Sequence, residues 1–169
     1  MAMLVWAMFV FTGMVGPVWA ADVAGQLPPY TVVSLTGEMV ALHESRGRVT
    51  VLNIWATWCG PCRKEMPSLQ KLHRQFQDRG LNVVGVNVDA PQADQSKRIE
   101  ELTHRLRIDY TILLDPEQKF VRTFRAIGVP QTLLIDRSGR ILRHWRGEFD
   151  PMAADVVRLV EQVLSNQGQ

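Results

Sequence analysis

Residues 49–62 read VTVLNIWATWCGPC, and this stretch carries both cysteines of the chain, Cys59 and Cys62. The apolar and β-branched run Val49–Trp55 is long enough for a buried strand. The residues that follow predict a helix from about Cys59 to Asp78, because apolar side chains recur there at helical spacing. The sequence therefore places a Cys-Gly-Pro-Cys segment where a buried strand turns into a helix.

The spacing of the two cysteines indicates a redox pair. Three residues apart on a helical turn, their Cα atoms should lie about 5–6 Å apart, within the range that a disulfide spans. Cys59 falls at the helix N-terminus, where unpaired backbone N–H groups and the helix dipole stabilise a thiolate. Cys62, one turn further on, should be less exposed. We therefore expect Cys59 to attack a partner's sulfur and Cys62 to resolve the mixed disulfide.

Three other roles fit the cysteine pair less well. A structural disulfide rarely has this spacing at the start of a helix. A zinc site needs two further ligands, and the chain has no third cysteine and no pair of histidines at ligand spacing, so no metal is expected. A peroxidatic cysteine follows the pattern P-x-x-x-T-x-x-C, but Leu52 and Ala56 occupy its proline and threonine positions.

Length and composition describe one folded domain. The chain has 169 residues, of which 46% are hydrophobic and 21% charged, values typical of a packed soluble protein. A chain of this length buries about two thirds of its unfolded surface and needs no disulfide framework to fold. The net charge is +2, a balance that predicts no nucleic-acid binding.

Residues 1–20 are expected to lie outside the folded domain, because they are apolar and carry no charged side chain. Val18 and Ala20 suit signal-peptidase cleavage after Ala20, although no basic residue precedes the apolar run. An uncleaved anchor is the alternative, since 21 helical residues reach roughly 32 Å and a bilayer core measures about 30 Å. Both interpretations place the folded part outside the cytoplasm, with a linker at 21–29 and a domain at 30–169.

The rest of the chain alternates strands and helices and then ends in a hairpin and a helix. This pattern predicts an α/β fold with a mixed central sheet flanked by helices. Asp115 and Pro116 are expected to open a short helix that ends at about Arg125, and Asp150 to cap a last helix with Pro151 at its first position. The other expected strands cover 30–35, 39–42, 81–88, 110–114, 131–136 and 140–145, and the other expected helix covers 93–106.

The segment WATWCGPC at 55–62 resembles the active site of thioredoxin. A wider match, over about residues 30–163, is with TlpA/ResA-like proteins, an extracytoplasmic branch that includes the CcmG/DsbE reductases of cytochrome c maturation. It is carried by RGRVTVLNIWATWCGPCRKEMP at 46–67 and LLDPEQKFVRTFRAIGVPQTLLIDRSGRI at 113–141. The resemblance implies a thioredoxin-like fold with an N-terminal β-hairpin extension and thiol:disulfide exchange activity. No nucleotide, flavin or haem motif is present, so no cofactor is expected.

The resemblance also implies a proton-transfer group near Cys62. Cytosolic thioredoxins carry a buried aspartate six residues before the first cysteine, but this chain has Asn53 there, which cannot take a proton. ResA-like proteins carry a glutamate three residues after the second cysteine, and here that residue is Glu65, on the same side of the helix as Cys62. Resolution by Cys62 needs a base, so we hypothesise that Glu65 replaces the aspartate. A solvated glutamate stabilised by the helix dipole is the alternative.

A substrate-binding surface is expected around Cys59. Residues 128–130 (GVP) match the cis-proline loop of the family, which faces the cysteines. A cis bond before Pro130 would present the Val129 backbone to an extended segment of the substrate. Trp58, partly exposed, and Pro61 should extend this apolar surface, to which Pro130 itself also contributes.

The Gly60-Pro61 pair between the cysteines favours a reductase. Thioredoxin has the same pair and a potential of about −270 mV, against about −120 mV for the oxidant DsbA. The resemblance implies disulfide-containing protein substrates, electrons from a membrane-embedded thiol reductase, and action as a monomer. A disulfide oxidase or isomerase is the first alternative, and a Cu(I)-delivery module that uses both thiolates is the second. His144, at the end of a strand, is expected only to pack.

Overall fold

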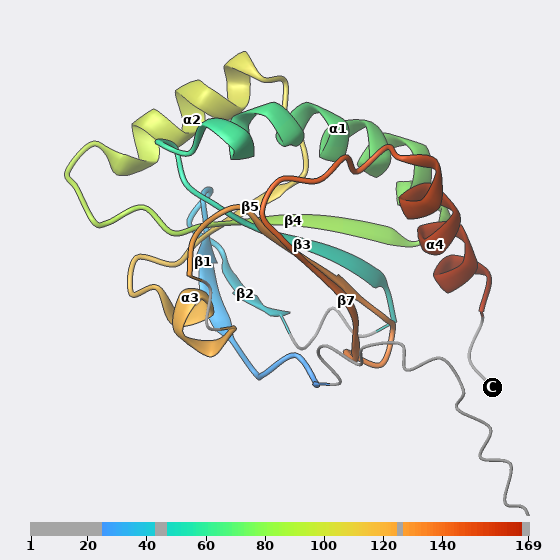
Figure 1. Cartoon of the computed structure of the whole chain (residues 1–169). Coiled ribbons are helices and arrows are strands. Elements are labelled where there is room, and N and C mark those ends of the chain that lie inside the picture. Colours follow the sequence, from blue (N-terminus) through green and yellow to red (C-terminus); the bar gives the residue numbers. More distant parts are fainter. Residues whose placement is uncertain (1–24, 43–46, 125–126, 167–169) are drawn as a thin grey trace, which may run out of the picture.

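A seven-stranded mixed sheet forms the centre of the computed structural model, which describes residues 25–42, 47–124 and 127–166 (Figure 1). The strand order is β2-β1-β5-β4-β3-β6-β7. Strands β3, β4 and β5 run parallel, whereas β6 and β7 pair antiparallel beside them and the β1–β2 hairpin extends the other edge. The strands are β1 (Thr31–Ser34), β2 (Met39–Ala41), β3 (Val49–Trp55), β4 (Leu81–Asn87), β5 (Thr111–Leu114), β6 (Gln131–Ile135) and β7 (Ile141–Arg146). The predicted α/β class, mixed sheet and N-terminal hairpin are confirmed.

Helices cover both faces of the sheet. Figure 1 shows α1, α2 and α4 on one face and the short α3 on the other. The crossovers through α1 and α2 both step across the sheet in the same direction, and right-handed crossovers of this kind put their helices on the same face. The helices are α1 (Gly60–Phe76), α2 (Gln95–Arg105), α3 (Lys119–Thr123) and α4 (Ala154–Ser165), and a 3-10 turn (Gln77–Arg79) extends α1.

Strand β3 lies at the centre of the core, as the sequence predicts. All seven of its residues are buried, because it is a central strand with β4 and β6 on its two sides. Gly85 in β4 lets the end of β3 pack closely: a Cβ added there would lie 3.0 Å from Trp55 Nε1 and 2.9 Å from Ile112 Cδ1. The sheet therefore fixes Trp55, the last residue before the loop that leads to the cysteines.

The last helix begins later than predicted. Asp150 does not cap α4, which starts at Ala154. Instead the Asp150 carboxylate accepts a hydrogen bond from the Met152 amide (2.9 Å), and its carbonyl accepts one from Ala153 (3.1 Å). An aspartate that bonds the backbone two residues on forms a turn of its own, so Pro151 lies in that turn and not at the first helical position.

The helix α3 also begins later than predicted, at Lys119. Asp115 still supports it, because its carboxylate accepts a hydrogen bond from the Phe120 amide (2.8 Å). Between them Gln118 has a left-handed backbone (φ 54°), which delays the helix beyond the predicted start at Asp115 and Pro116. The predicted end at Arg125 lies outside the described residues.

The described part of the predicted linker packs against the sheet. The Leu27 amide donates to the Gly139 carbonyl (2.8 Å), and the Ile141 amide donates to the Gly25 carbonyl (2.9 Å). Leu27 is buried in the core. The predicted signal or anchor at residues 1–20 lies outside the described residues, and no helix within the described ranges is long and apolar enough to cross a bilayer.

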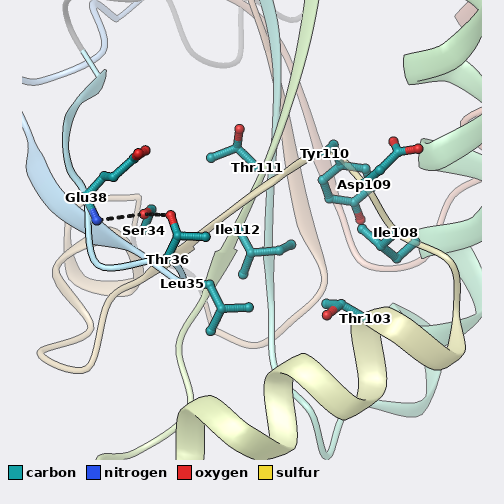
Figure 2. A pocket seen from close by; sticks show the side chains of 10 residues that line it. All are labelled: Ser34, Leu35, Thr36, Glu38, Thr103, Ile108, Asp109, Tyr110, Thr111 and Ile112. Carbon is teal, nitrogen blue, oxygen red and sulfur yellow. Dashed lines mark hydrogen bonds between the residues drawn. The ribbon is translucent and has the colours of Figure 1, made fainter.

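A hollow of about 300 Å³ lies between the hairpin, the end of α2 and the start of β5 (Figure 2). Leu35, Thr103 and Tyr110 are among its lining residues. It opens at the amino end of β5, whereas the cysteines follow the carboxyl end of the parallel strand β3. The hollow therefore lies at the opposite end of the sheet from the Cys-Gly-Pro-Cys segment.

Candidate active site

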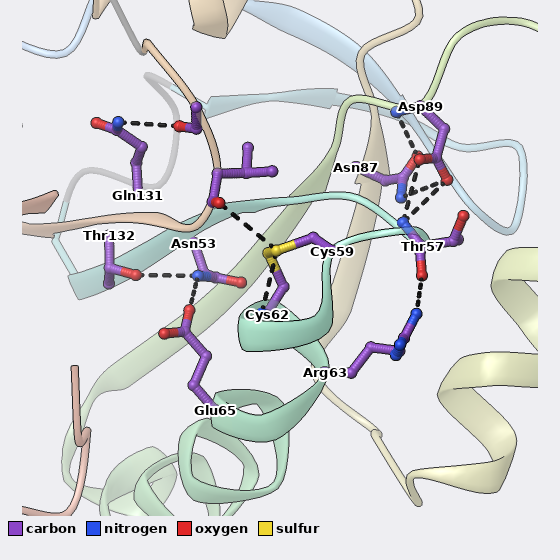
Figure 3. The surroundings of a disulfide bond; sticks show 12 residues. Asn53, Thr57, Cys59, Cys62, Arg63, Glu65, Asn87, Asp89, Gln131 and Thr132 are labelled. Carbon is purple, nitrogen blue, oxygen red and sulfur yellow. Dashed lines mark hydrogen bonds between the residues drawn. A yellow bond between two sulfur atoms is a disulfide. The ribbon is translucent and has the colours of Figure 1, made fainter. Parts of the chain in front are cut away.

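Cys59 and Cys62 form a disulfide at the start of α1 (Figure 3). Their Cα atoms lie 5.3 Å apart, within the distance that the sequence predicts. Cys59 is the N-cap residue of α1, and its Sγ accepts a hydrogen bond from the Cys62 amide at 3.1 Å. The first turn of the helix therefore aims a backbone N–H group at the sulfur that is expected to carry the negative charge when the pair is reduced.

The two sulfurs differ in their access to solvent. Cys59 is 4% exposed and Cys62 is fully buried, so the predicted order of exposure is confirmed. Trp58, immediately before the pair, is 69% exposed, and Pro61 is also exposed. An incoming disulfide can thus reach only Cys59, at a surface that is partly apolar.

The Val129–Pro130 peptide bond is cis, as predicted. The carbonyl oxygen of Val129 lies 3.6 Å from Cys59 Sγ, so this loop faces the redox pair. Pro130, which the sequence analysis places on the apolar surface, is instead buried, because it leads directly into the buried strand β6 and its carbonyl accepts a hydrogen bond from Gly147 (2.9 Å). Ile127, which that analysis missed, is fully exposed beside the loop. Its position three residues before the cis-proline is the signal that could have found it.

A buried polar network lies beneath the first turns of α1 (Figure 3). Asn53 Nδ2 donates to Glu65 Oε1 at 2.7 Å and to Thr132 Oγ1 at 2.9 Å. Glu65 is 3% exposed and Asn53 is fully buried. The alternative of a solvated Glu65 is therefore wrong: the side chain points into the protein, on the face of α1 that also carries Cys62.

Burial controls the protonation of Glu65. The pKa of its carboxyl is raised to about 7, chiefly by loss of solvation and to a smaller extent by the nearby Glu148. The hydrogen bond from Asn53 and the backbone amide of Phe149 lower the pKa. The second carboxyl oxygen of Glu65, Oε2, has no hydrogen-bond partner among the described residues. The group is thus poised to gain or lose a proton near neutral pH.

A second set of contacts, which the sequence analysis did not identify, fixes the loop before Cys59. Both oxygens of the Asp89 carboxylate accept the Thr57 amide, at 3.1 and 3.2 Å, and Asn87 Nδ2 donates to Oδ2 of the same group at 3.2 Å. Arg63 Nη1 donates to the Thr57 carbonyl at 2.7 Å. The backbone that presents Trp58 and Cys59 is therefore held from both sides.

These features together define a centre for thiol–disulfide exchange in a thioredoxin-like fold. It has one accessible sulfur at a helix N-terminus, a second buried sulfur one turn away, and a buried carboxyl group that titrates near neutrality. Comparison with known proteins agrees with this class. The model of the AhpC/TSA family matches residues 23–144, and the chain belongs to this family.

Similar proteins include one whose name states the activity that the geometry supports. The thiol-disulfide oxidoreductase ResA of Geobacillus thermodenitrificans is 30% identical over 122 residues, which are 72% of this chain and 68% of the relative. The thioredoxin-like protein YneN of Bacillus subtilis is 32% identical over 116 residues, 69% of this chain and 66% of the relative. The protein is accordingly a thiol:disulfide oxidoreductase.

A solved structure agrees with the fold over almost the whole domain. A crystal structure from Chlorobium tepidum, assigned as a thiol:disulfide interchange protein DsbE, is 30% identical to this chain with a TM-score of 0.72. The match covers 87% of this chain and 99% of that structure. The predicted resemblance to the ResA-like and DsbE-like branch is confirmed.

Proposed function

We propose that the protein reduces disulfides of other proteins outside the cytoplasm. In its reduced form, the Cys59 thiolate attacks one sulfur of a client disulfide, and the other client sulfur leaves as a thiolate. Cys62 Sγ then attacks Cys59 Sγ, which releases the second client thiolate and leaves the Cys59–Cys62 disulfide. The observation that carries this proposal is the asymmetric pair at the start of α1, with only Cys59 exposed to any extent.

Glu65 supplies the base for the resolving step in this proposal. Cys62 is fully buried, and a thiol without solvent must give its proton to a nearby group before it attacks. Glu65 lies three residues further along the same helix, and its pKa of about 7 leaves part of the population ionised at neutral pH. Its carboxylate accepts the proton, and Asn53 holds the carboxyl group in place.

Client proteins dock on the apolar surface around Cys59 in this proposal. Trp58, Pro61 and Ile127 are exposed, and Val129 is half-buried. The Val129 backbone, beside Cys59 Sγ, can pair with an extended client segment as one strand pairs with another. A surface that combines backbone pairing with apolar side chains suits protein disulfides better than small thiols.

Two features of the sequence support the proposed direction of electron transfer and the proposed compartment. The Gly60-Pro61 pair is that of thioredoxin, whose potential of about −270 mV is reducing. The apolar, uncharged residues 1–20 support export to the periplasm or an equivalent compartment, held by an anchor or released by cleavage. There a membrane-embedded thiol reductase must return electrons to the oxidised pair, and cytochrome c maturation is the process that the resemblance favours.

A disulfide isomerase or oxidase is the second candidate. A solved structure assigned to a protein disulfide isomerase from Bacteroides thetaiotaomicron is 27% identical with a TM-score of 0.75, so the same fold carries that assignment. Copper delivery has less support, since the described residues hold no cluster of three or more His, Cys, Asp or Glu side chains suited to a metal ion.

The experiment that tests the direction uses the protein from Ala21 onward and a peptide that carries two cysteines. Reduced protein is mixed with the peptide disulfide, and oxidised protein with the peptide dithiol, and both reactions are quenched with acid and analysed by mass. A reductase transfers electrons to the peptide, and Cys62→Ser stops the reaction at the mixed disulfide. Net oxidation of the peptide dithiol would contradict the proposed direction and favour an oxidase.

A further inference from the structure

Two polar side chains support the cis-proline loop from the face of the sheet opposite Glu65. In β6, Thr132 points towards Asn53 beneath α1, so its neighbour Gln131 points to the other face, since side chains alternate along a strand. The register pairs Gln131 with Arg146 and Leu133 with His144. Gln131 and His144 are thus diagonal neighbours on the same face, within reach of each other.

The hydrogen bonds of this pair run in one direction. Gln131 Nε2 donates to the Gly128 carbonyl at 2.9 Å, and Gln131 Oε1 lies 2.6 Å from His144 Nε2. A carbonyl can only accept, so the amide nitrogen must face Gly128 and the amide oxygen must face His144. His144 Nε2 therefore carries a hydrogen and donates it to Gln131. The sequence analysis expected His144 only to pack, and this contact corrects that expectation.

The contact ends on the loop that faces the redox pair. Gly128 precedes Val129, whose carbonyl lies 3.6 Å from Cys59 Sγ, and follows the fully exposed Ile127. Gly147, the residue after β7, holds the same loop a second time, because its amide donates to the Pro130 carbonyl at 2.9 Å. Gln131 is only 5% exposed, so its amide has little water to replace a lost partner.

We infer that His144 and Gln131 are positioning residues that hold residues 127–130 in the conformation that binds a client segment. The inference rests on the proposed function, because it assumes that this loop pairs with protein substrates. A loop that is fixed before binding loses less conformational entropy when the client pairs with it. The pair touches neither sulfur, so it sets the affinity for clients and leaves the thiol chemistry unchanged.

The test compares a peptide disulfide with a small disulfide as substrates of the full-length chain. Gln131→Glu keeps an acceptor for His144 but replaces the donor to Gly128 with a carboxylate oxygen. We expect KM for the peptide disulfide to rise about 5- to 10-fold, the loss of one buried hydrogen bond, with kcat within about 2-fold. The rate with oxidised glutathione, which is too small to pair along the loop, should stay within about 2-fold of wild type.

Variants at His144 provide a matched series. His144→Gln retains an N–H donor and should keep KM for the peptide close to wild type, whereas His144→Leu should raise it about 3- to 5-fold. Arg143 is an exposed neighbour in β7, and Arg143→Gln serves as the control. It should change neither KM for the peptide nor the rate with oxidised glutathione. If Gln131→Glu does not fold, as judged by circular dichroism, the two His144 variants carry the test alone.

The inference is overturned if KM for the peptide is unchanged in Gln131→Glu and His144→Leu. It is also overturned if these variants slow both substrates equally, because that result would indicate a general structural role. Failure of the proposed function looks different: wild-type protein would then show no preference for the peptide over oxidised glutathione. If wild type prefers the peptide over oxidised glutathione and both variants keep that preference, the proposed function stands and the inference is rejected.

Discussion

The two faces of the sheet beside the cysteines carry different kinds of polar group. Beneath α1, Asn53 donates to the buried carboxyl of Glu65, whose pKa lies near 7, and also to Thr132. On the opposite face, Gln131 and His144 form an amide–imidazole pair that ends on a backbone carbonyl. Residues 131 and 132 are adjacent in β6, so the alternation of one strand separates the proposed proton-transfer group from the proposed positioning pair.

The two networks also differ in how fully their hydrogen bonds are satisfied. Glu65 Oε2 and Asn53 Oδ1 have no partner among the described residues, which is costly in a buried site. Both functional atoms of the Gln131 amide have partners. A carboxyl group with an unpartnered oxygen can take up a proton, whereas an amide does not titrate and is here held at both of its polar atoms. The face beneath α1 therefore suits chemistry, and the face opposite suits recognition.

The largest expected effect comes from the redox pair, which lies between the two networks. Cys59→Ser should lower the exchange rate with any disulfide at least 1,000-fold (an order-of-magnitude expectation), because the remaining thiol, Cys62, is fully buried. Cys62→Ser should still attack and then accumulate the mixed disulfide with the peptide. Mass spectrometry of acid-quenched reactions distinguishes the two variants, and a mixed disulfide that accumulates on Cys59→Ser would reverse the assigned roles.

Glu65→Gln should slow the resolving step, which depends on the face beneath α1, and leave binding of the peptide unchanged. We expect resolution of the mixed disulfide to slow by about 100-fold at pH 7, the lower end of what a positioned base contributes. The rise of the wild-type rate around pH 7 should disappear. KM for the peptide should not change. Stopped-flow measurement of resolution between pH 5 and pH 9 tests this, and a wild-type pH profile in Glu65→Gln would refute the role of Glu65.

The same carboxyl should make stability depend on pH. Its folded-state pKa of about 7 exceeds the ordinary value of 4.5, so the folded protein holds a proton that the unfolded chain releases. The free energy of unfolding of oxidised wild type should therefore fall as pH rises from about 4.5 to about 7, by roughly 3 kcal/mol. Urea unfolding at pH 5 and pH 8 measures this fall. Glu65→Gln should show a much smaller fall, and an equal one would assign the effect to other groups.

Asn53→Leu should have a smaller effect than Glu65→Gln, on the pH at which the resolution rate reaches its midpoint. The Asn53 amide donates to Glu65 and lowers its pKa, so its removal should move the midpoint of the resolution rate above pH 7. Thr132→Val removes a neighbour of the network that does not contact the carboxyl in the described structure, and it serves as the control. A midpoint that moves to lower pH in Asn53→Leu would contradict this assignment.

The smallest effect is expected at the exposed surface. Trp58→Ala removes an indole that is 69% exposed, so it should lower kcat/KM for the peptide disulfide about 3-fold, a loss typical of a peripheral contact. The rate with oxidised glutathione should remain the same. A loss greater than about 30-fold would make Trp58 a principal anchor of the client and displace the loop at 127–130 from that role.

Local sequence was sufficient for much of the fold and for part of the site. The run Val49–Trp55 and the spacing of Cys59 and Cys62 act within one strand or one helical turn, so they can be predicted from neighbours along the chain. Glu65 was identified by the resemblance to ResA-like proteins, and its place three residues after Cys62 puts it on the same side of the helix. Asp150 shows the limit of such reasoning, because an aspartate before a proline fits both a helix cap and a separate turn, and only the backbone geometry decides between them.

The positioning pair could not be predicted in the same way. Gln131 and His144 are 13 residues apart, and their contact depends on the register of two antiparallel strands. A contact of this kind arises from tertiary structure, and neither periodicity nor a motif in the chain indicates it. Ile127 differs, because its place just before the cis-proline is readable in the sequence.

The redox equilibrium of the Cys59–Cys62 pair tests the central claim most directly. The protein from Ala21 onward is equilibrated in buffers of known glutathione or dithiothreitol ratio at pH 7, and the fluorescence of Trp55 and Trp58 reports the oxidised fraction. A reductase of protein disulfides should have a potential near the thioredoxin value of about −270 mV. A potential near about −120 mV would make the protein an oxidant and contradict the proposed direction.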